Sequence, residues 1–128
     1  SITGASVACA IAFERMVADG TLKTSPLTGH VSAVSCGVYE DVAILDLCYL
    51  EDRDARVDFN IVMTEDADFV ELQGSGEEDT FSSEEMSAML ELGRKGVSEI
   101  SELQRQAVRS ALGDAGEDAA QRLAEHFN

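Results

Sequence analysis

Apolar residues recur at helical spacing in two parts of the chain. The first part, residues 3–19, is rich in small side chains, with Thr3 suited to an N-cap and Gly20 to the position just beyond a helix end. The second part opens at Ser82, whose spacing to Glu85 matches a capping box, and carries a long stripe of methionine, leucine, isoleucine and valine. The pattern predicts two helices, each with one face in a core.

Between these helices, apolar and polar residues alternate as they do in half-buried strands. In the stretch after Val57, the residues Phe59 and Ile61 face one way, while Asp58 and Asn60 face the other. The alternation predicts an α+β domain with a four-stranded sheet and helices packed on it. The predicted strands are two pairs, residues 30–38 with 42–50 across a turn at 39–41, and residues 58–64 with 69–73 across a turn at 65–68, followed by a loop at 74–80.

The length of 128 residues suits one domain with a hydrophobic core. We assign residues 1–112 to this domain and residues 113–128 to an acidic tail that is either helical or disordered. The chain has nine Lys and Arg against 25 Asp and Glu, a formal net charge of −16. Such a chain binds nucleic-acid backbones poorly unless its basic residues are concentrated, and the acidity is typical of a solvated surface.

The three cysteines, Cys9, Cys36 and Cys48, are odd in number and lie in apolar surroundings. We therefore expect reduced core thiols in an intracellular protein. No run approaches the roughly 20 apolar residues of a membrane span, and the N-terminal stretch lacks the basic region and cleavage pattern of a signal peptide. The absence of an initial Met suggests a fragment or a processed product.

Candidate chemistry lies in an acidic cluster between two predicted strands. Several carboxylates at the end of a buried strand suggest a functional role, because unpaired buried charge is costly. Carboxylates held close together bind a divalent cation or act as acid and base, although an EF-hand is excluded because its mid-loop glycine is absent. The cluster consists of Asp46, Glu51, Asp52, Asp54 and Asp58.

The spacing within this cluster leaves its pairing open. Asp54 and Asp58 are four apart and would share a face on a helix. Asp52 and Asp58 are about 240° apart on a continuous helix, so they would meet only if a single helical turn linked two strands and the chain doubled back. The structural alternative is a solvated turn in which the carboxylates pair with Arg53 and Arg56.

Motifs along the chain resemble the ribonuclease PH family. The resemblance runs from residue 1 to about residue 111 and corresponds to the C-terminal half of such an enzyme. The most specific part is the Asp58–Asp66 block followed by a Val-Glu-Leu-Gln-Gly segment. The motifs are Ser1-Ile-Thr-Gly-Ala5, Thr28-Gly-His-Val-Ser-Ala-Val-Ser-Cys-Gly37, Leu45-Asp-Leu with Tyr49-Leu-Glu-Asp52, Asp58-Phe-Asn-Ile-Val-Met-Thr-Glu-Asp66, Phe69-Val-Glu-Leu-Gln-Gly74 and Phe81-Ser82.

The resemblance implies a phosphate-dependent 3′-to-5′ exoribonuclease that trims transfer RNA precursors, processes ribosomal RNA and releases nucleoside diphosphates. It implies a cytoplasmic hexameric ring, a trimer of dimers, that binds RNA and uses inorganic phosphate as co-substrate. Asp52 and Asp58 match the family's two aspartates, which are thought to hold a Mg²⁺ ion or to supply the acid for the leaving ribose 3′ oxygen. Both roles lower a barrier raised by repulsion between two phosphates. The resemblance therefore favours Asp52 with Asp58 over Asp54 with Asp58.

The chain also departs from the family pattern. Arg53 and Asp54 stand where small residues are usual, Arg56 stands at a commonly acidic position, and Ala67 replaces a turn glycine. The arginines could alter metal affinity or help to hold RNA phosphates. The family's phosphate-binding segment precedes the point at which this chain starts. The resemblance therefore implies a missing N-terminal half and an inactive isolated fragment.

Two other functions stay open: a non-catalytic subunit of an exosome-like ring, and a stand-alone cation-binding domain. The first is disfavoured because non-catalytic ring subunits commonly lose the two aspartates, which this chain keeps. For the remaining singled-out residues we expect structural roles. His30 is expected to be structural. Arg94, Lys95, Arg105 and Arg109 are expected to solvate the long helix, with contact to RNA or to a neighbouring subunit as the open alternative.

Overall fold

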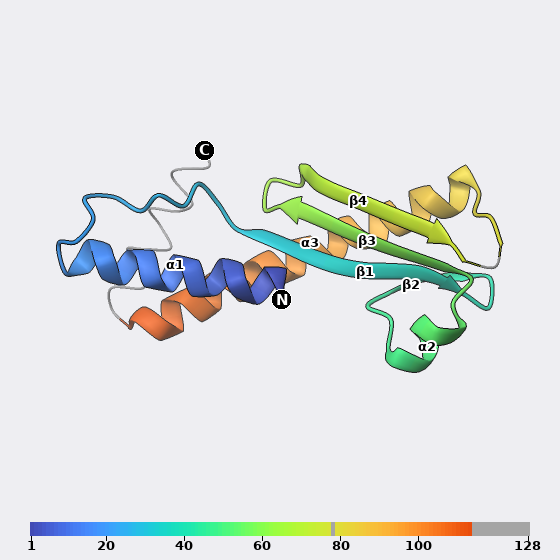
Figure 1. Ribbon diagram of the computed structural model, residues 1–128, viewed down its shortest axis with the longest axis horizontal. Helices are drawn as coiled ribbons and strands as arrows, with labels where there is room; N and C mark the ends of the chain where they lie inside the picture. The colour runs from blue at the N-terminus through green and yellow to red at the C-terminus, as the bar shows by residue number, and fades with distance from the viewer. Residues whose placement is uncertain (78, 114–128) are drawn as a thin grey trace. The chain divides into compact units, whose positions relative to one another are not determined.

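The computed structural model describes residues 1–77 and 79–113, and the description excludes the side chains of Tyr49 and Asp52. All but the first residue of the predicted acidic tail therefore lies outside the described residues. The described residues form two long helices, one short helix and a sheet, which are labelled in Figure 1. In chain order these elements are α1 (Ile2–Ala18), β1 (Val31–Tyr39), β2 (Val42–Leu45), α2 (Tyr49–Asp54), β3 (Val57–Thr64), β4 (Phe69–Gly76) and α3 (Ser83–Leu112).

The chain divides into two compact units, which we call the helical unit and the sheet unit. The helical unit comprises residues 1–32 and the chain from residue 99, and the sheet unit comprises residues 33–98. The helical unit contains α1 and the C-terminal part of α3, whereas the sheet unit contains the sheet, α2 and the N-terminal part of α3. The predicted α+β class is confirmed.

The sheet has four strands in the order β2-β1-β3-β4, with neighbouring strands antiparallel (Figure 1). A two-residue turn joins β1 to β2, and its residues Glu40 and Asp41 have positive φ angles of 50° and 62°, as a type I′ hairpin turn requires. The turn between β3 and β4 places Ala67 at φ 67°, which explains why a glycine would suit this position. Both predicted hairpins are confirmed.

The predicted strand at residues 42–50 is too long. β2 ends at Leu45, because Asp46 takes a positive φ of 61° and turns the chain out of the ladder. The short helix α2 then replaces the rest of the predicted strand. Its start is stabilised by the backbone N–H of Cys48, which donates to Glu51 Oε2 at 2.9 Å.

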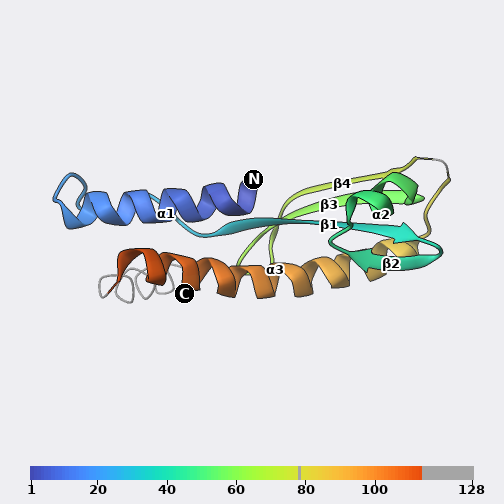
Figure 2. The ribbon, with the colours of Figure 1, turned by 90° about the horizontal axis from the view of Figure 1, so that it is seen from below.

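The core of the sheet unit lies between the sheet and the N-terminal part of α3, which runs along one face (Figure 2). Two helix glycines allow this close approach. A Cβ on Gly93 would lie 2.4 Å from Ile61 Cδ1, and one on Gly96 would lie 3.0 Å from Leu45 Cδ2. The predicted capping box starts α3, since the Ser82 N–H donates to Glu85 Oε1 at 3.0 Å and the Glu85 N–H donates to Ser82 Oγ at 3.1 Å.

The helical unit has its own small core around Ala10 and Val108. The predicted first helix is confirmed, with Gly20 just beyond its end at φ 85°. Its N-cap is Ser1, so the predicted N-cap, Thr3, was wrong by two residues. The other apolar residues packed against this core are Val7, Ile11, Leu27 and Leu112.

The three cysteines are free, but only part of the prediction about them holds. Cys36 is buried in the sheet unit, where burial raises the pKa of its thiol to about 11. Cys9 and Cys48 are exposed, so their predicted core location was wrong. Their apolar sequence neighbours do not bury them. Cys9 lies on an exposed face of α1, and Cys48 lies at the exposed start of α2. None of the described helices combines the length and apolarity needed to cross a bilayer.

Candidate acidic site at the junction of α2 and β3

The strand β3 presents Asp58 on the face of the sheet that α3 does not cover. Val57 and Phe59 are buried, Asp58 is half-buried and Asn60 is exposed, which confirms the predicted alternation. In the ladder with β4, Asp58 pairs with Ser75. This open face therefore carries polar side chains at the start of β3, among them the half-buried carboxylate of Asp58.

A polar pair lies next to Asp58 on the open face. Ser35 Oγ in β1 donates a hydrogen bond to Asn60 Oδ1 in β3 at 3.0 Å. Asn60 in turn pairs with Gln73 of β4 in the strand register. The sequence reasoning missed Ser35 and Gln73, although strand alternation with the correct strand order would have placed both on the same face as Asp58.

The connector before α2 lies close over the same face. A Cβ on Gly37 would lie 2.7 Å from Leu47 Cδ1 and 2.5 Å from the Val57 carbonyl oxygen. Gly37 thus leaves room for Leu47, which anchors the connector on β1 beside the start of β3. The close approach requires glycine at this position.

The structure shows a short helix, α2, between β2 and β3, which is one part of the backbone condition for the pairing of Asp52 with Asp58. The helix ends at Asp54, and β3 starts at Val57 after the extended residue Ala55. The chain therefore passes from one helical segment straight into the strand that carries Asp58. Because the Asp52 side chain lies outside the description, the convergence of the two carboxylates stays a prediction.

The alternative pairing of Asp54 with Asp58 on one helix is excluded. Asp54 is the last residue of α2, and Asp58 belongs to a strand. Asp54 is bound by Arg53 instead, with Nε to Oδ1 and Nη2 to Oδ2 both at 2.9 Å. Hydrogen bonding from Arg53 lowers the pKa of Asp54. This part of the cluster is the predicted solvated ion pair.

The other acidic residues serve the local fold or lie exposed. Glu51 caps α2 through the Cys48 N–H, and Asp46 occupies the exposed turn after β2. Among the side chains that the structure describes, no group of three His, Cys, Asp or Glu is placed to hold a metal ion. Magnesium commonly takes one or two protein carboxylates and completes its shell with water and substrate phosphates, so the pair Asp52 and Asp58 has a suitable chemistry.

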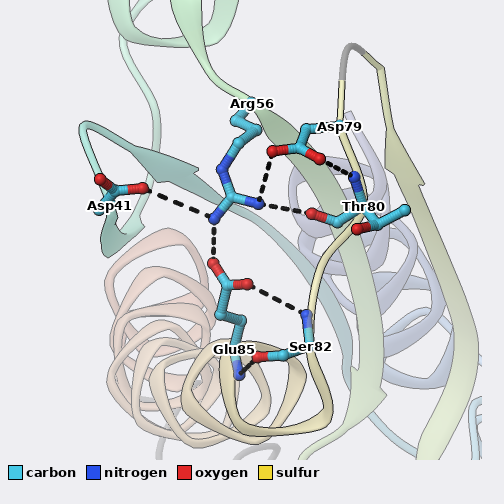
Figure 3. Close-up of polar contacts among 6 residues, drawn as sticks. All are labelled: Asp41, Arg56, Asp79, Thr80, Ser82 and Glu85. Atoms are coloured by element: carbon cyan, nitrogen blue, oxygen red, sulfur yellow. Dashed lines mark hydrogen bonds and ion pairs between the residues drawn. The ribbon is translucent and has the colours of Figure 1, made fainter.

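The second arginine near the site, Arg56, is engaged with the protein on several sides. Its guanidinium contacts the Glu85 carboxylate and the Thr80 carbonyl oxygen, and lies 3.9 Å from carboxylate oxygens of Asp41 and Asp79 (Figure 3). No local pattern in the sequence predicts these partners, because they come from three separate segments.

The burial of His30 agrees with its expected structural role, and the arginines of α3 form ion pairs on the helix surface, where contact with RNA or a neighbouring subunit stays an open alternative. His30 is buried in the helical unit, and its Nδ1 lies 3.2 Å from Ser6 Oγ. On the surface of α3, Arg94 pairs with Glu91 at 3.1 Å, while Arg105 and Arg109 pair with Glu102 at 3.0 and 3.2 Å. Lys95 is exposed.

Comparison with known proteins identifies relatives that share this architecture. Residues 29–96 match the model of the 3′ exoribonuclease family, domain 2. The chain is 45% identical to ribonuclease PH of Bacillus subtilis (strain 168) over 113 residues, which are 88% of this chain and 46% of that protein. The matched region is the C-terminal part of that relative, so the chain spans about half of its length.

A solved structure agrees on the fold. The crystal structure of rice (Oryza sativa) Rrp46 matches with a TM-score of 0.55 and 24% sequence identity, covering 76% of this chain and 44% of that chain. At this identity the likeness concerns the fold alone. The family segment at residues 29–96 contains both Asp52 and Asp58.

Proposed function

The chain belongs to the 3′ exoribonuclease family, and we propose that it forms the C-terminal part of a phosphate-dependent 3′-to-5′ exoribonuclease. The observation that carries this proposal is the placement of Asp58 on the open face of the sheet, directly after the short helix that contains Asp52. The substrate that we propose is the 3′ end of transfer RNA. The shared sequence with ribonuclease PH supports this reading of the site.

In the proposed reaction an oxygen of inorganic phosphate attacks the last phosphodiester phosphorus. The bond from that phosphorus to the 3′ oxygen of the preceding ribose breaks, and the 3′ oxygen takes up a proton. The products are a nucleoside diphosphate and an RNA shorter by one nucleotide. The barrier is high because two anionic phosphates must approach each other.

Asp52 and Asp58 serve this step at the leaving 3′ oxygen. As carboxylates they would hold a divalent cation, and a bound Mg²⁺ would neutralise the charge that develops on the phosphates and the leaving oxygen. Alternatively, one of them in its protonated form would donate the proton to the 3′ oxygen. Ionised and protonated forms of the pair predict opposite responses to pH, so a pH profile distinguishes them.

We assign the binding of RNA and phosphate mainly to the rest of the complete protein, because this chain is strongly acidic. A chain with a net charge of −16 repels RNA and phosphate, so we assign their main binding residues to the part that precedes the matched region. We further propose that the complete protein is cytoplasmic and assembles into a hexameric ring of dimers, as the relation to ribonuclease PH suggests. Retention of both aspartates favours an enzymatic role over a purely structural one.

The test joins this chain to the N-terminal part of the Bacillus subtilis relative that it does not match. The assay follows nucleoside diphosphate release from a transfer RNA 3′ tail, with and without phosphate. Asp58→Ala and Asp52→Ala should each lower the rate by about 10²-fold or more. Asp54→Ala is the matched control, since Asp54 is exposed and bound only to its neighbour among the contacts described above. Full activity after Asp58→Ala would sink the proposal.

A further inference from the structure

Arg56 lies at the junction between the two halves of the proposed site. It stands four residues after Asp52 and two before Asp58. Its backbone is held on both sides, because its N–H donates to the Val38 carbonyl at 2.9 Å and its own carbonyl accepts from the Glu77 N–H at 3.2 Å. The start of β3 is thus tied to the end of β1 and to the loop after β4.

The Arg56 side chain adds further ties from the same point (Figure 3). Its Nη1 donates to the Thr80 carbonyl and lies 3.9 Å from Asp79, whereas its Nη2 binds the Glu85 carboxylate and lies 3.9 Å from Asp41. We call this set, Arg56 with Asp41, Asp79, Thr80 and Glu85, the Arg56 clamp. The clamp joins the β1–β2 turn, the loop between β4 and α3, and the first turn of α3 to the start of β3.

The cation is central to the clamp because the Glu85 carboxylate contacts it directly and two exposed carboxylates, those of Asp41 and Asp79, lie 3.9 Å from it. Asp41, Asp79 and Glu85 would repel one another without the guanidinium, and a chain with nine cationic residues against 25 acidic ones has few replacements. Glu85 binds on two sides, since one oxygen accepts from the Ser82 N–H at 3.0 Å and the other binds Arg56. Loss of Arg56 would therefore loosen the start of α3 as well as that of β3.

The other arginine beside the site has a different environment. The Arg53 side chain is 56% exposed and pairs with its sequence neighbour Asp54, whereas the Arg56 side chain is 24% exposed and its partners lie 15 to 29 positions away in sequence. A pair between neighbours fixes no tertiary contact, and an exposed pair contributes little to stability. A partly buried, multiply bonded guanidinium holds separate segments in one arrangement.

We propose that Arg56 is a positioning residue, which fixes the start of β3 and thereby the Asp58 carboxylate next to the helix that carries Asp52. This inference rests on the proposed function, since it assigns a purpose to the position of Asp58. It disfavours a role for Arg56 in holding RNA phosphates, because the guanidinium already binds the Glu85 carboxylate and the Thr80 carbonyl and has two further carboxylates at 3.9 Å. The two roles predict different kinetics.

The kinetic test compares Arg56→Ala, Arg56→Lys and Arg94→Ala in the joined enzyme described above. Arg56→Ala should lower kcat by about tenfold to a hundredfold with little change in KM for RNA, because misplacement of a catalytic group by about 1 Å costs on this order. Arg56→Lys should recover part of the loss by restoring the charge without the fork of donors. Arg94→Ala removes an α3 arginine from its Glu91 pair and should leave kcat unchanged.

A second measurement tests the positioning role of Arg56 without an activity assay. Amide hydrogen exchange of a peptide covering residues 56–60 should be about tenfold faster in Arg56→Ala than in Arg94→Ala, because the start of β3 opens locally. Added guanidinium ion should slow this exchange and restore kcat in Arg56→Ala. Rescue of this kind would not follow from general loss of stability.

Unchanged kcat together with unchanged exchange in Arg56→Ala would overturn the inference. A raised KM at constant kcat would overturn it as well, and would identify Arg56 as an RNA contact. If the joined enzyme releases no nucleoside diphosphate at all, the proposed function fails. The exchange measurement then still supports or overturns the control of β3 by Arg56.

Discussion

The open face around Asp58 and the interior of the helical unit both carry polar side chains, but those of the open face are exposed or half-buried, whereas those of the interior are buried. On the open face, Asp58, Asn60 and Ser35 are exposed or half-buried on a sheet whose other face is packed. In the helical unit, His30 and Gln104 are about 1% exposed. Polar groups held at the surface of a rigid sheet remain available to a ligand, whereas buried polar groups must find partners inside the protein.

The interior group centres on Gln104. Its Nε2 donates to the Val31 carbonyl at 2.9 Å and to the Thr3 carbonyl at 3.2 Å, so one α3 side chain joins the start of β1 to the start of α1. His30 is held by Ser6, which also accepts from the Val31 N–H at 3.2 Å. The comparison predicts that substitutions on the open face affect activity and that substitutions in the interior affect stability.

The largest effect that separates the two regions is expected from Asp58→Asn in the joined enzyme. Activity should fall by about 10²- to 10⁴-fold, because the substitution removes the charge and the proton but keeps the shape. The free energy of unfolding, measured by urea titration, should change by no more than about 1 kcal/mol, because Asn preserves the size of the side chain and can still hydrogen-bond. A large loss of stability with normal turnover would show that Asp58 supports the fold and does not take part in the reaction.

The converse substitution is Gln104→Leu. It removes two part-buried hydrogen bonds and leaves the carbonyls of Val31 and Thr3 without this donor, which should cost about 1–3 kcal/mol. Urea unfolding measures the cost, and activity per folded molecule should stay within about twofold, because Gln104 belongs to the helical unit and shares no described contact with Asp58. Gln106→Leu is the matched control, since Gln106 is exposed on the same helix. Equal stability of the two variants would contradict the structural role of Gln104.

The pH dependence of stability offers a smaller test of the interior. Burial, and then the nearby charge of Arg105, lower the pKa of His30, so the unfolded chain binds the proton more tightly than the folded one. Stability is therefore full above the unfolded pKa of about 6.5 and falls as the pH drops through and below it. The slope from one proton cannot exceed about 1.4 kcal/mol per pH unit.

The free energy of unfolding of the His126→Asn variant should fall as the pH is lowered from 7.5 to 5, since His30 is then its sole histidine. The further substitution His30→Gln should flatten the curve in this range. A slope that survives the removal of both histidines would assign the effect to other groups.

Local patterns in the sequence were sufficient for most of the fold. Both long helices, both hairpins and the capping box at Ser82 follow from spacing, because each depends on residues within a few positions of one another. The end of β2 was missed, since the positive φ of Asp46 has no strong signal in a residue other than glycine. The exposure of Cys9 and Cys48 was missed because burial depends on which helix face meets the core.

The candidate site was predictable in part for the same reason. The alternation around Asp58 is local, and the structure confirms it. The partners of Arg56 are not local, because Asp41, Asp79 and Glu85 meet only after the sheet and α3 assemble. The sequence therefore indicated charge beside the aspartates and left open whether that charge would bind RNA or the protein itself.

The smallest expected effect sharpens the distinction between a polar residue that is buried and one that is used. Ser101 is 3% exposed, and its hydroxyl has no hydrogen-bond partner among the described residues. It lies one turn before Gln104 on α3, which makes two hydrogen bonds. Ser101→Ala should therefore be neutral or stabilising by up to about 1 kcal/mol, because it removes an unsatisfied buried group. A loss above about 1 kcal/mol in urea unfolding would indicate a partner for the hydroxyl, such as a buried water that bridges it to Gln104 Oε1.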